Sequence, residues 1–312
     1  MNADAPVSVV FTTYESPRWL EKTLWGMLYQ SHRAFEIVVA DDGSGEATRA
    51  VIERYRPELA ARGVPLRHLR HADDGFRKCR ILNEAIVAAA HDYVVMTDGD
   101  CVCRADFLAV HVARAETGRW LSGSYYKLPM ATSEAIGRND VASGRCFERR
   151  WLRAHGLPGG PRSRTKLVRR PWLARAMNRL TPTACNLKGA NASAWRADLL
   201  AAGGFDERMQ WGGLDRELGV RLTNAGVRPR HVRYDAICLH LDHARGYRDE
   251  AMVAANRALW RQVERDGVTR TAHGIAALGD VPHAARAHEL GATPAAGAVV
   301  AADARTSPDA RV

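Results

Sequence analysis

Short apolar runs alternate with segments of helical periodicity along the first third of the chain. The apolar, β-branched runs predict buried strands, at 7–14, 35–44, 65–71 and 92–100. The segments between them place apolar side chains at helical spacing, at 17–31, 46–55 and 79–92. Because strands separated by helices pair in parallel through right-handed crossovers, the pattern predicts an α/β fold with an open, mostly parallel sheet.

Polar side chains close three of these predicted strands. They are Thr12, Thr13 and Tyr14 on the first strand, Asp41 and Asp42 on the second, and Asp98 and Asp100 on the fourth. In open α/β sheets ligands bind outside the carboxyl ends of the strands, so we expect a site there. Asp98 and Asp100 flank Gly99 and repel each other unless a metal ion, a basic side chain or solvent lies between them.

Composition indicates the general class of the protein but does not indicate its function. The chain has 312 residues, of which 46% are apolar, and no apolar run is long enough to span a membrane. The N-terminus lacks the basic start of a secretory signal, so we expect a cytoplasmic protein. Six scattered cysteines lack zinc-site spacing and are interpreted as idle thiols. A formal net charge of +10 favours a polyanionic partner.

Positive charge is concentrated between residues 145 and 179. This stretch holds eleven basic residues against one acid, Glu148. The basic residues are Arg145, Arg149, Arg150, Arg153, Arg162, Arg164, Lys166, Arg169, Arg170, Arg175 and Arg179. It is either a solvated insertion or a surface that meets anionic lipid or an anionic acceptor. The Ala-rich tail from about 280 is expected to be disordered.

Five motifs, in order, resemble the family 2 glycosyltransferases of the GT-A fold. They are VSVVFTTYE, VVADDGS, DDGFRKCRILNEAI, YVVMTDGDCV and LKGANASAWRADLLAAGGFDERMQWGGLDRELGVRL. The last block is also similar to the carboxy-terminal segment of β-1,4-galactosyltransferases. The resemblance covers roughly residues 7–245 and implies a Rossmann-like GT-A domain over 1–275. Its parts are a nucleotide-binding half at about 1–125, the basic insertion at about 139–185, an acceptor and catalytic segment at about 186–245, a C-terminal helix at about 246–275, and the separate tail 280–312.

The resemblance implies a divalent cation at the acidic turn. Asp100 would coordinate the ion directly, and Asp98 would lie near the ribose and the metal shell. Hard cations such as Mg²⁺ and Mn²⁺ prefer these oxygen ligands. His240 matches the position of a metal-binding histidine, with His243 as a rival, and an imidazole ligand favours Mn²⁺ over Mg²⁺.

The resemblance also assigns the nucleotide of a UDP-sugar donor to the first two strand ends. Asp41 would accept a hydrogen bond from the uracil ring, and Thr12 and Tyr14 would contact the base. Asp42 is expected to cap the following turn. Arg77 and Arg80 either reach the nucleotide or are solvated.

The acceptor side depends on WGGLDREL at 211–218. The matching motif makes Asp215 the base that takes the proton from the acceptor hydroxyl. Trp211 would support the acceptor sugar, and Gly212 and Gly213 would let the backbone come close. Leu214 stands where the family has Glu, so Glu217 either replaces that acceptor contact or faces solvent. Asn191 is expected to line the acceptor cleft and Lys188 to meet phosphate.

The expected activity is an inverting, metal-dependent transfer of galactose or a related hexose from a UDP-sugar. The acceptor would be a saccharide or lipid-linked saccharide of a bacterial surface polysaccharide or lipopolysaccharide. Peripheral contact with an anionic membrane through residues 145–179 is a further expectation, and no nucleic acid partner is expected. Two alternatives remain, a nucleotidyltransferase that makes nucleotide sugars and a non-catalytic polyanion-binding protein.

Overall fold

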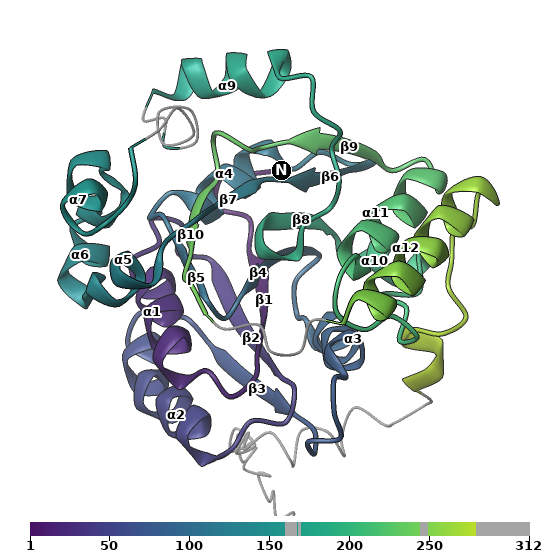
Figure 1. The fold of residues 1–312 in the computed structure, drawn as a ribbon, viewed down its shortest axis with the longest axis horizontal. Helices are drawn as coiled ribbons and strands as arrows, with labels where there is room; N and C mark the ends of the chain where they lie inside the picture. The colour runs from purple at the N-terminus through teal and green to yellow at the C-terminus, as the bar shows by residue number, and fades with distance from the viewer. Residues whose placement is uncertain (160–166, 168–169, 244–248, 279–312) are drawn as a thin grey trace, which may run out of the picture. The chain divides into compact units, whose positions relative to one another are not determined.

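The apolar runs of the first hundred residues form strands that are buried on both faces. Every residue of β1 (Val7–Thr13) and β2 (Phe35–Asp41) is buried. Such runs are typical of parallel strands covered by helices on both sides, which explains why they lack a polar alternation. The predicted α/β fold with a mostly parallel central sheet is confirmed (Figure 1).

The computed structural model describes residues 1–159, 167, 170–243 and 249–278. Met1–Gly279 and Asp280–Val312 are separate units, and the predicted tail at 280–312 lies outside the described residues. The remaining elements of the N-terminal half are α1 (Pro17–Leu28), α2 (Glu46–Ala60), β3 (Leu66–Arg70), α3 (Lys78–Ala88), β4 (Tyr93–Asp98), β5 (Cys101–Cys103), α4 (Phe107–Arg114), β6 (Arg119–Ser122), β7 (Ser124–Lys127), α5 (Met130–Ala135), α6 (Arg138–Ala142), η1 (Arg145–Phe147) and α7 (Arg149–Ala154). Those of the C-terminal half are α9 (Pro171–Leu180), η2 (Gly189–Asn191), β8 (Ala192–Trp195), α10 (Arg196–Ala201), α11 (Leu214–Asn224), β9 (Arg228–His231), β10 (Ile237–His240), α12 (Glu250–Arg265) and η3 (Ile275–Leu278).

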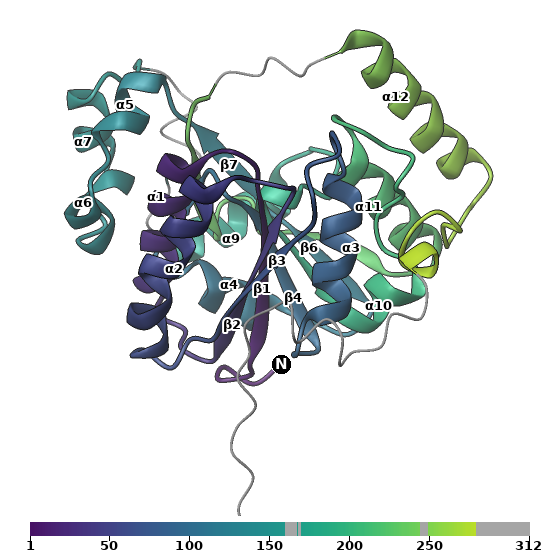
Figure 2. The same ribbon diagram turned by 90° about the horizontal axis from the view of Figure 1, so that it is seen from below.

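The central sheet has the strand order β3-β2-β1-β4-β8-β6-β9. The first four strands are parallel, while β8 runs antiparallel to both β4 and β6. Figure 2 shows α1 and α2 on one face of this sheet and α3, α10 and α11 on the other. The chain therefore changes direction across the sheet between β1 and β4, and this switch point is where an open α/β sheet binds its ligands.

A small second sheet, in the order β5-β10-β7, lies next to the end of β4. Its strand β10 pairs antiparallel with β5, so that His240 lies opposite Cys101, directly after the acidic turn. This sheet was not expected from the sequence. It brings the end of β10 to the Asp98–Asp100 turn.

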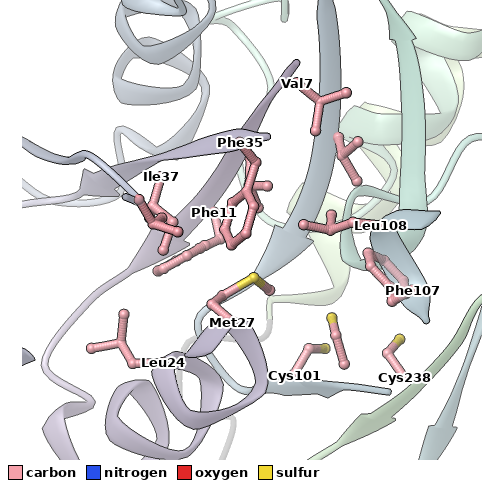
Figure 3. Packing of buried hydrophobic residues seen from close by; sticks show 14 of the residues in the cluster. Val7, Phe11, Leu24, Met27, Phe35, Ile37, Cys101, Phe107, Leu108 and Cys238 are labelled. Atoms are coloured by element: carbon pink, nitrogen blue, oxygen red, sulfur yellow. The ribbon is translucent and has the colours of Figure 1, made fainter. Parts of the chain in front are cut away.

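The main core lies between α1, α4 and the two sheets. Phe11 of β1, Met27 of α1 and Cys101 of β5 all belong to one buried cluster, and Figure 3 shows them together with Cys238 of β10. All three side chains have at most 1% of their surface exposed. Because the core clamps β1, β5 and β10 together, the residues at their ends are held in fixed positions.

Candidate functional site

The acidic turn lies directly at the switch point of the sheet. Thr12 of β1 pairs in register with Asp98 of β4, and the Gly99 backbone N–H donates to the Thr12 carbonyl at 2.9 Å. A Cβ at Gly99 would lie 2.5 Å from that carbonyl oxygen. The glycine is therefore required by the close approach of the two strand ends, and it fixes where Asp98 and Asp100 lie.

Asp98 is held by a lysine that the sequence analysis did not select. Lys78 Nζ, at the first residue of α3, donates to Asp98 Oδ1 at 2.9 Å, and Thr12 Oγ1 lies 3.5 Å from the same oxygen. Burial acts to lower the pKa of Lys78, but Asp98 and Asp215 outweigh it and raise that pKa above its usual value. The ammonium is therefore a fixed positive charge in the site. Its position at the start of α3 gives no signal of this role in the sequence, because a lysine there is typical of a solvated turn.

Asp100 faces two imidazoles from the second sheet and the segment that follows it. Its Oδ2 lies 3.0 Å from His243 Nε2 and 3.5 Å from His240 Nε2, and the side chain is 17% exposed. Burial acts to raise the pKa of Asp100, but the two histidines outweigh it and lower the pKa. The structure thus brings together the predicted ligands Asp100 and His240 with the rival His243.

The tautomer of His240 is set by its other ring nitrogen. His240 Nδ1 lies 2.8 Å from the Leu241 carbonyl oxygen, which can only accept, so Nδ1 carries the proton. In the neutral ring the Nε2 lone pair then faces the Asp100 carboxylate, and two acceptors repel unless a proton or a cation lies between them. Asp100, His240 and His243 offer ligand atoms within 4.8 Å of one another, as do Asp98, Asp100 and Cys101. The donor set therefore fits a divalent cation.

The acidic pair at the end of β2 is placed differently. Asp41 has no exposed surface, its Oδ1 accepts from the Ser44 backbone N–H at 2.8 Å, and its Oδ2 lies 2.8 Å from His68 Nε2. Because the Asp41 side chain has no exposed surface, it has no room to meet a base, so the structure contradicts the prediction that Asp41 binds uracil. Asp41 also makes the turn contact that was expected of Asp42. Asp42 instead receives the Arg77 backbone N–H and contacts His71.

The other residues predicted for nucleotide binding lie around the same strand ends. Tyr14 is 51% exposed, and its hydroxyl donates to Asp73 at 3.1 Å. The Arg77 guanidinium donates to Asp74 at 2.8 Å. Arg80 is held by Glu84 and Glu207 through longer contacts. Contacts of Thr12, Tyr14 and Arg77 with a base remain predictions.

Asp215 lies in the first turn of α11, close to the acidic turn. A Cβ added to Gly189 of η2 would be 2.7 Å from Asp215 Oδ1, and the Gly189 backbone acts to lower the pKa of this carboxylate. Burial raises the pKa of Asp215 to about 6, the positive charge of Lys78 acts against that rise, and the negative charge of Asp98 adds to it. The predicted base therefore lies within electrostatic reach of the Lys78–Asp98 pair.

The loop before α11 is built from the predicted acceptor residues. Gly212 and Gly213 have φ of +98° and +90°, a conformation that glycine adopts without strain. Asn256 of α12 donates to the carbonyls of Gln210, Trp211 and Gly212 at 3.2, 3.2 and 2.8 Å. The loop is thus fixed from α12, and a role of Trp211, Gly212 and Gly213 toward an acceptor stays a prediction.

Two residues predicted for the acceptor side are buried in the scaffold. Asn191 has no exposed surface and donates to the carbonyls of Ser124 and Ala236, both at 2.9 Å, so the structure contradicts its placement in an acceptor cleft. Glu217 is also wholly buried, where both its oxygens bind Arg221 at 2.6 Å. It neither faces solvent nor replaces the missing family Glu, and Leu214 is itself buried.

The basic segment is described only in part. Arg162, Arg164, Lys166 and Arg169 lie outside the described residues. Arg149, Arg150, Arg153, Arg170, Arg175 and Arg179 are exposed on or next to α7 and α9. A groove of about 710 Å³ runs between α4 and α9, away from the acidic turn. Among the helices that the structure describes, none combines the length and hydropathy needed to cross a membrane.

Comparison with known proteins agrees with this arrangement. Residues 8–160 match the sequence model described as Glycosyl transferase family 2. Validoxylamine A glucosyltransferase from Streptomyces hygroscopicus subsp. jinggangensis is 27% identical over 254 residues, which are 77% of this chain and 56% of that protein. Chondroitin synthase from Escherichia coli is 26% identical over 243 residues, which are 72% of this chain and 33% of that protein. The chain thus spans about a third to a half of the length of these two curated relatives.

Solved structures share the fold. The mannosyltransferase from Pyrobaculum calidifontis, in complex with GDP-Man and Mn²⁺, gives a TM-score of 0.52 at 17% identity, over 93% of this chain and 76% of that chain. TarS 1–349 from S. aureus, in complex with UDP-GlcNAc, gives 0.54 at 15% identity, over 91% of this chain and 70% of that chain. The expected family and the expected GT-A fold are both confirmed.

Proposed function

Because the chain belongs to glycosyltransferase family 2, we propose that it transfers a hexose with inversion from a UDP-sugar to a saccharide or lipid-linked saccharide, with the help of a divalent cation. The family match makes the protein a glycosyltransferase, which disfavours the nucleotidyltransferase and the non-catalytic binder. The identity of the sugar, the metal and the acceptor are the parts that we propose.

One observation carries the proposal. Asp215 follows Asp100 by more than a hundred residues, yet in the first turn of α11 it lies within electrostatic reach of Lys78 and Asp98. A proton acceptor near a site for a nucleotide diphosphate is the arrangement that a single displacement requires. A protein that only binds polyanions has no need of a partly buried carboxylate with a raised pKa at this place.

Asp100, His240 and His243 would hold the cation, with Asp98 close by. When bound, the metal acts as a Lewis acid that stabilises the negative charge of a departing diphosphate. Two imidazoles beside a carboxylate favour Mn²⁺ over Mg²⁺. The named complex of the Pyrobaculum mannosyltransferase with GDP-Man and Mn²⁺ supports this choice of metal by analogy. The TarS complexes with UDP-GlcNAc and UDP support a uridine donor in the same way.

The protein's own groups then perform the transfer. Lys78 offers positive charge beside the diphosphate, and Gly189 packs closely against the Asp215 carboxylate. Asp215 takes the proton of the acceptor hydroxyl while that oxygen bonds to the anomeric carbon. The bond from this carbon to the diphosphate oxygen breaks, and UDP leaves with the electron pair. Because attack and departure occur on opposite faces, the anomeric configuration inverts.

The acceptor and the cellular setting follow from the acceptor loop and from the relatives. Trp211 would carry the acceptor sugar on the loop that Asn256 fixes. Relatives named as chondroitin synthases support a polysaccharide acceptor. Galactose follows only from the similarity of residues 186–245 to galactosyltransferases. We further propose that the enzyme works in the cytoplasm on bacterial surface glycans, in peripheral contact with the membrane.

The direct test is Asp215→Asn, assayed with a panel of nucleotide sugars, Mn²⁺ and saccharide acceptors. The variant should bind UDP and Mn²⁺ as the wild type does in calorimetry, while transfer falls about 1,000-fold because the hydroxyl proton has no acceptor. Asp266→Asn, an exposed aspartate at the end of α12, is the matched control and should retain full activity. Transfer at the wild-type rate by Asp215→Asn would refute the assigned base.

A further inference from the structure

Helix α9 presents apolar and basic side chains together on its outer side. Trp172 is 63% exposed and Leu180 is 77% exposed, which is unusual for side chains of this size. Arg175 and Arg179 are exposed on the same helix, which contains no acid, and Arg175 stands at the edge of the outer side, where it also lines the groove between α4 and α9. At about 100° per residue these four side chains fall within an arc of about 140°.

The opposite side of α9 attaches it to the rest of the protein. Ala174 is buried against Tyr234, with Leu173 and Met177 packed beside them. The Asn178 side chain accepts from the Tyr234 backbone N–H at 3.1 Å. Figure 1 shows α9 at the upper edge of the view, with no other described element on its outer side. The outer face is therefore an ordered surface on an anchored helix.

We propose that the outer face of α9, formed by Trp172, Arg175, Arg179 and Leu180, docks on an anionic lipid membrane. Arginine guanidiniums pair with lipid phosphates and gain about fivefold in binding per charge near an anionic surface. Tryptophan and leucine gain by entering the boundary between headgroups and acyl chains. The exposed arginines of α7, Arg149, Arg150 and Arg153, add positive charge outside this face.

The arginines of this face complement any anionic partner, but its exposed tryptophan and leucine favour a membrane over a nucleic acid. A phosphodiester backbone would use Arg175 and Arg179, but it offers nothing to Leu180, which is the most exposed of the large apolar side chains in the described chain. No described carboxylate forms an ion pair with Arg175 or Arg179, so both charges are available to a partner. This inference concerns where the enzyme works and does not depend on the identity of its donor.

Flotation with vesicles tests the proposal. The full chain should float with vesicles of phosphatidylcholine containing phosphatidylglycerol and remain unbound with phosphatidylcholine alone. Trp172→Ser combined with Leu180→Ser should weaken binding to the anionic vesicles at least about tenfold, as should Arg175→Gln combined with Arg179→Gln. Met130→Ser, an exposed apolar residue of α5, and Arg257→Gln combined with Arg265→Gln, on α12, are matched controls that should float like the wild type.

Depth-dependent quenching gives a second readout that does not need loss of binding. Trp172→Phe should still float with the vesicles. Brominated lipid should quench less tryptophan fluorescence in this variant than in the wild type. Absence of binding to anionic vesicles would overturn the proposal. So would Trp172→Ser with Leu180→Ser floating like the wild type, or displacement of the protein from vesicles by excess RNA. Hydrolysis of a soluble donor, measured in parallel, should be unchanged in all α9 variants, which separates this inference from the proposed chemistry.

Discussion

Two acidic pairs that look alike in sequence end two neighbouring strands in different ways. VVADDGS at the end of β2 and VVMTDGD at the end of β4 are both apolar runs that lead into two aspartates and a glycine. Asp41 and Asp42 at the end of β2 are satisfied by His68 and His71, from β3 and the residue after it, and by backbone N–H groups. This first pair is part of the scaffold that shapes the edge of the sheet.

The pair at the end of β4 faces a lysine and two histidines. Lys78 comes from α3, and His240 and His243 come from the end of β10 and the residues after it. The Asp100–His240 separation of 3.5 Å is too long for a strong hydrogen bond, unlike the 2.8 Å contact of Asp41 with His68. The second pair is a candidate site because Asp100 faces two imidazoles whose ring nitrogens can bind a cation.

The largest effect is expected at the second pair, from Asp100→Asn. This change keeps the shape of the side chain but removes a charged oxygen ligand, so transfer should fall about 1,000-fold and the dependence on Mn²⁺ should weaken. The free energy of unfolding should change little, because the loss concerns a ligand site. Initial rates across a Mn²⁺ titration, with urea unfolding beside them, measure both. An unchanged requirement for Mn²⁺ would mean that Asp100 holds no metal.

Lys78→Met should lower kcat/KM about 100-fold, because the charge beside Asp98 and the donor phosphates is lost. It should also change the pH profile. Asp215 must be ionised to act as a base, so wild-type kcat/KM should fall as pH drops below about 6, the value to which its pKa is raised. Lys78 lowers that pKa, so its removal should move the acidic limb to higher pH.

Lys78→Arg is the conservative variant with which to compare the acidic side of the pH profile of kcat/KM. It restores the positive charge, so the acidic limb should return toward the wild-type position even if the rate stays reduced. If the acidic fall of kcat/KM occurs at the same pH in Lys78→Met as in the wild type, Lys78 does not affect the pKa of Asp215. Lys78 would then act only as a partner of Asp98.

Gly189→Ala should lower kcat about 30-fold with a small change in the KM for the donor, because the new Cβ would lie 2.7 Å from Asp215 Oδ1 and displace the carboxylate. Gly137→Ala is a matched control. Gly137 likewise lies beside a carboxylate, that of Asp140, to which its N–H donates at 2.9 Å, but a Cβ there would meet this carboxylate at 3.3 Å. Steady-state kinetics of the two variants would show whether crowding of Asp215 is specific. If kcat of Gly189→Ala equals that of Gly137→Ala, Asp215 tolerates displacement.

The strands of the first hundred residues were predictable because each is a continuous apolar run closed by polar residues. The second sheet was not, because β5 and β10 have only three and four residues and pair across more than a hundred positions. The match to a family motif placed Asp100, His240 and Asp215, and these do gather at one edge. The same reasoning failed for Asn191 and Asp41.

Those failures share a physical cause. The sequence near a motif does not distinguish a short polar residue that faces a ligand from one that satisfies buried backbone groups. Asn191 is of the second kind, because it donates to two buried carbonyls. Lys78 was overlooked for the opposite reason, since a lysine between two arginines at a helix start is typical of a solvated turn. Only the location of Asp98 beside it reveals its role.

The smallest effect on catalysis is expected at the first pair, from Asp41→Asn. Transfer should change less than about threefold, but the free energy of unfolding should fall by about 1–3 kcal/mol, because the amide cannot replace a buried carboxylate between His68 and the Ser44 N–H. Burial acts to raise the pKa of Asp41, yet its hydrogen bonds with His68 and Ser44 outweigh it and lower the pKa. The carboxylate therefore stabilises the fold above the unfolded pKa of about 4 and loses this contribution as pH falls further. Urea unfolding at pH 7 and at acidic pH should show the wild-type advantage shrinking with acid. A large loss of transfer with unchanged stability would reverse the comparison and give the end of β2 a direct part in catalysis.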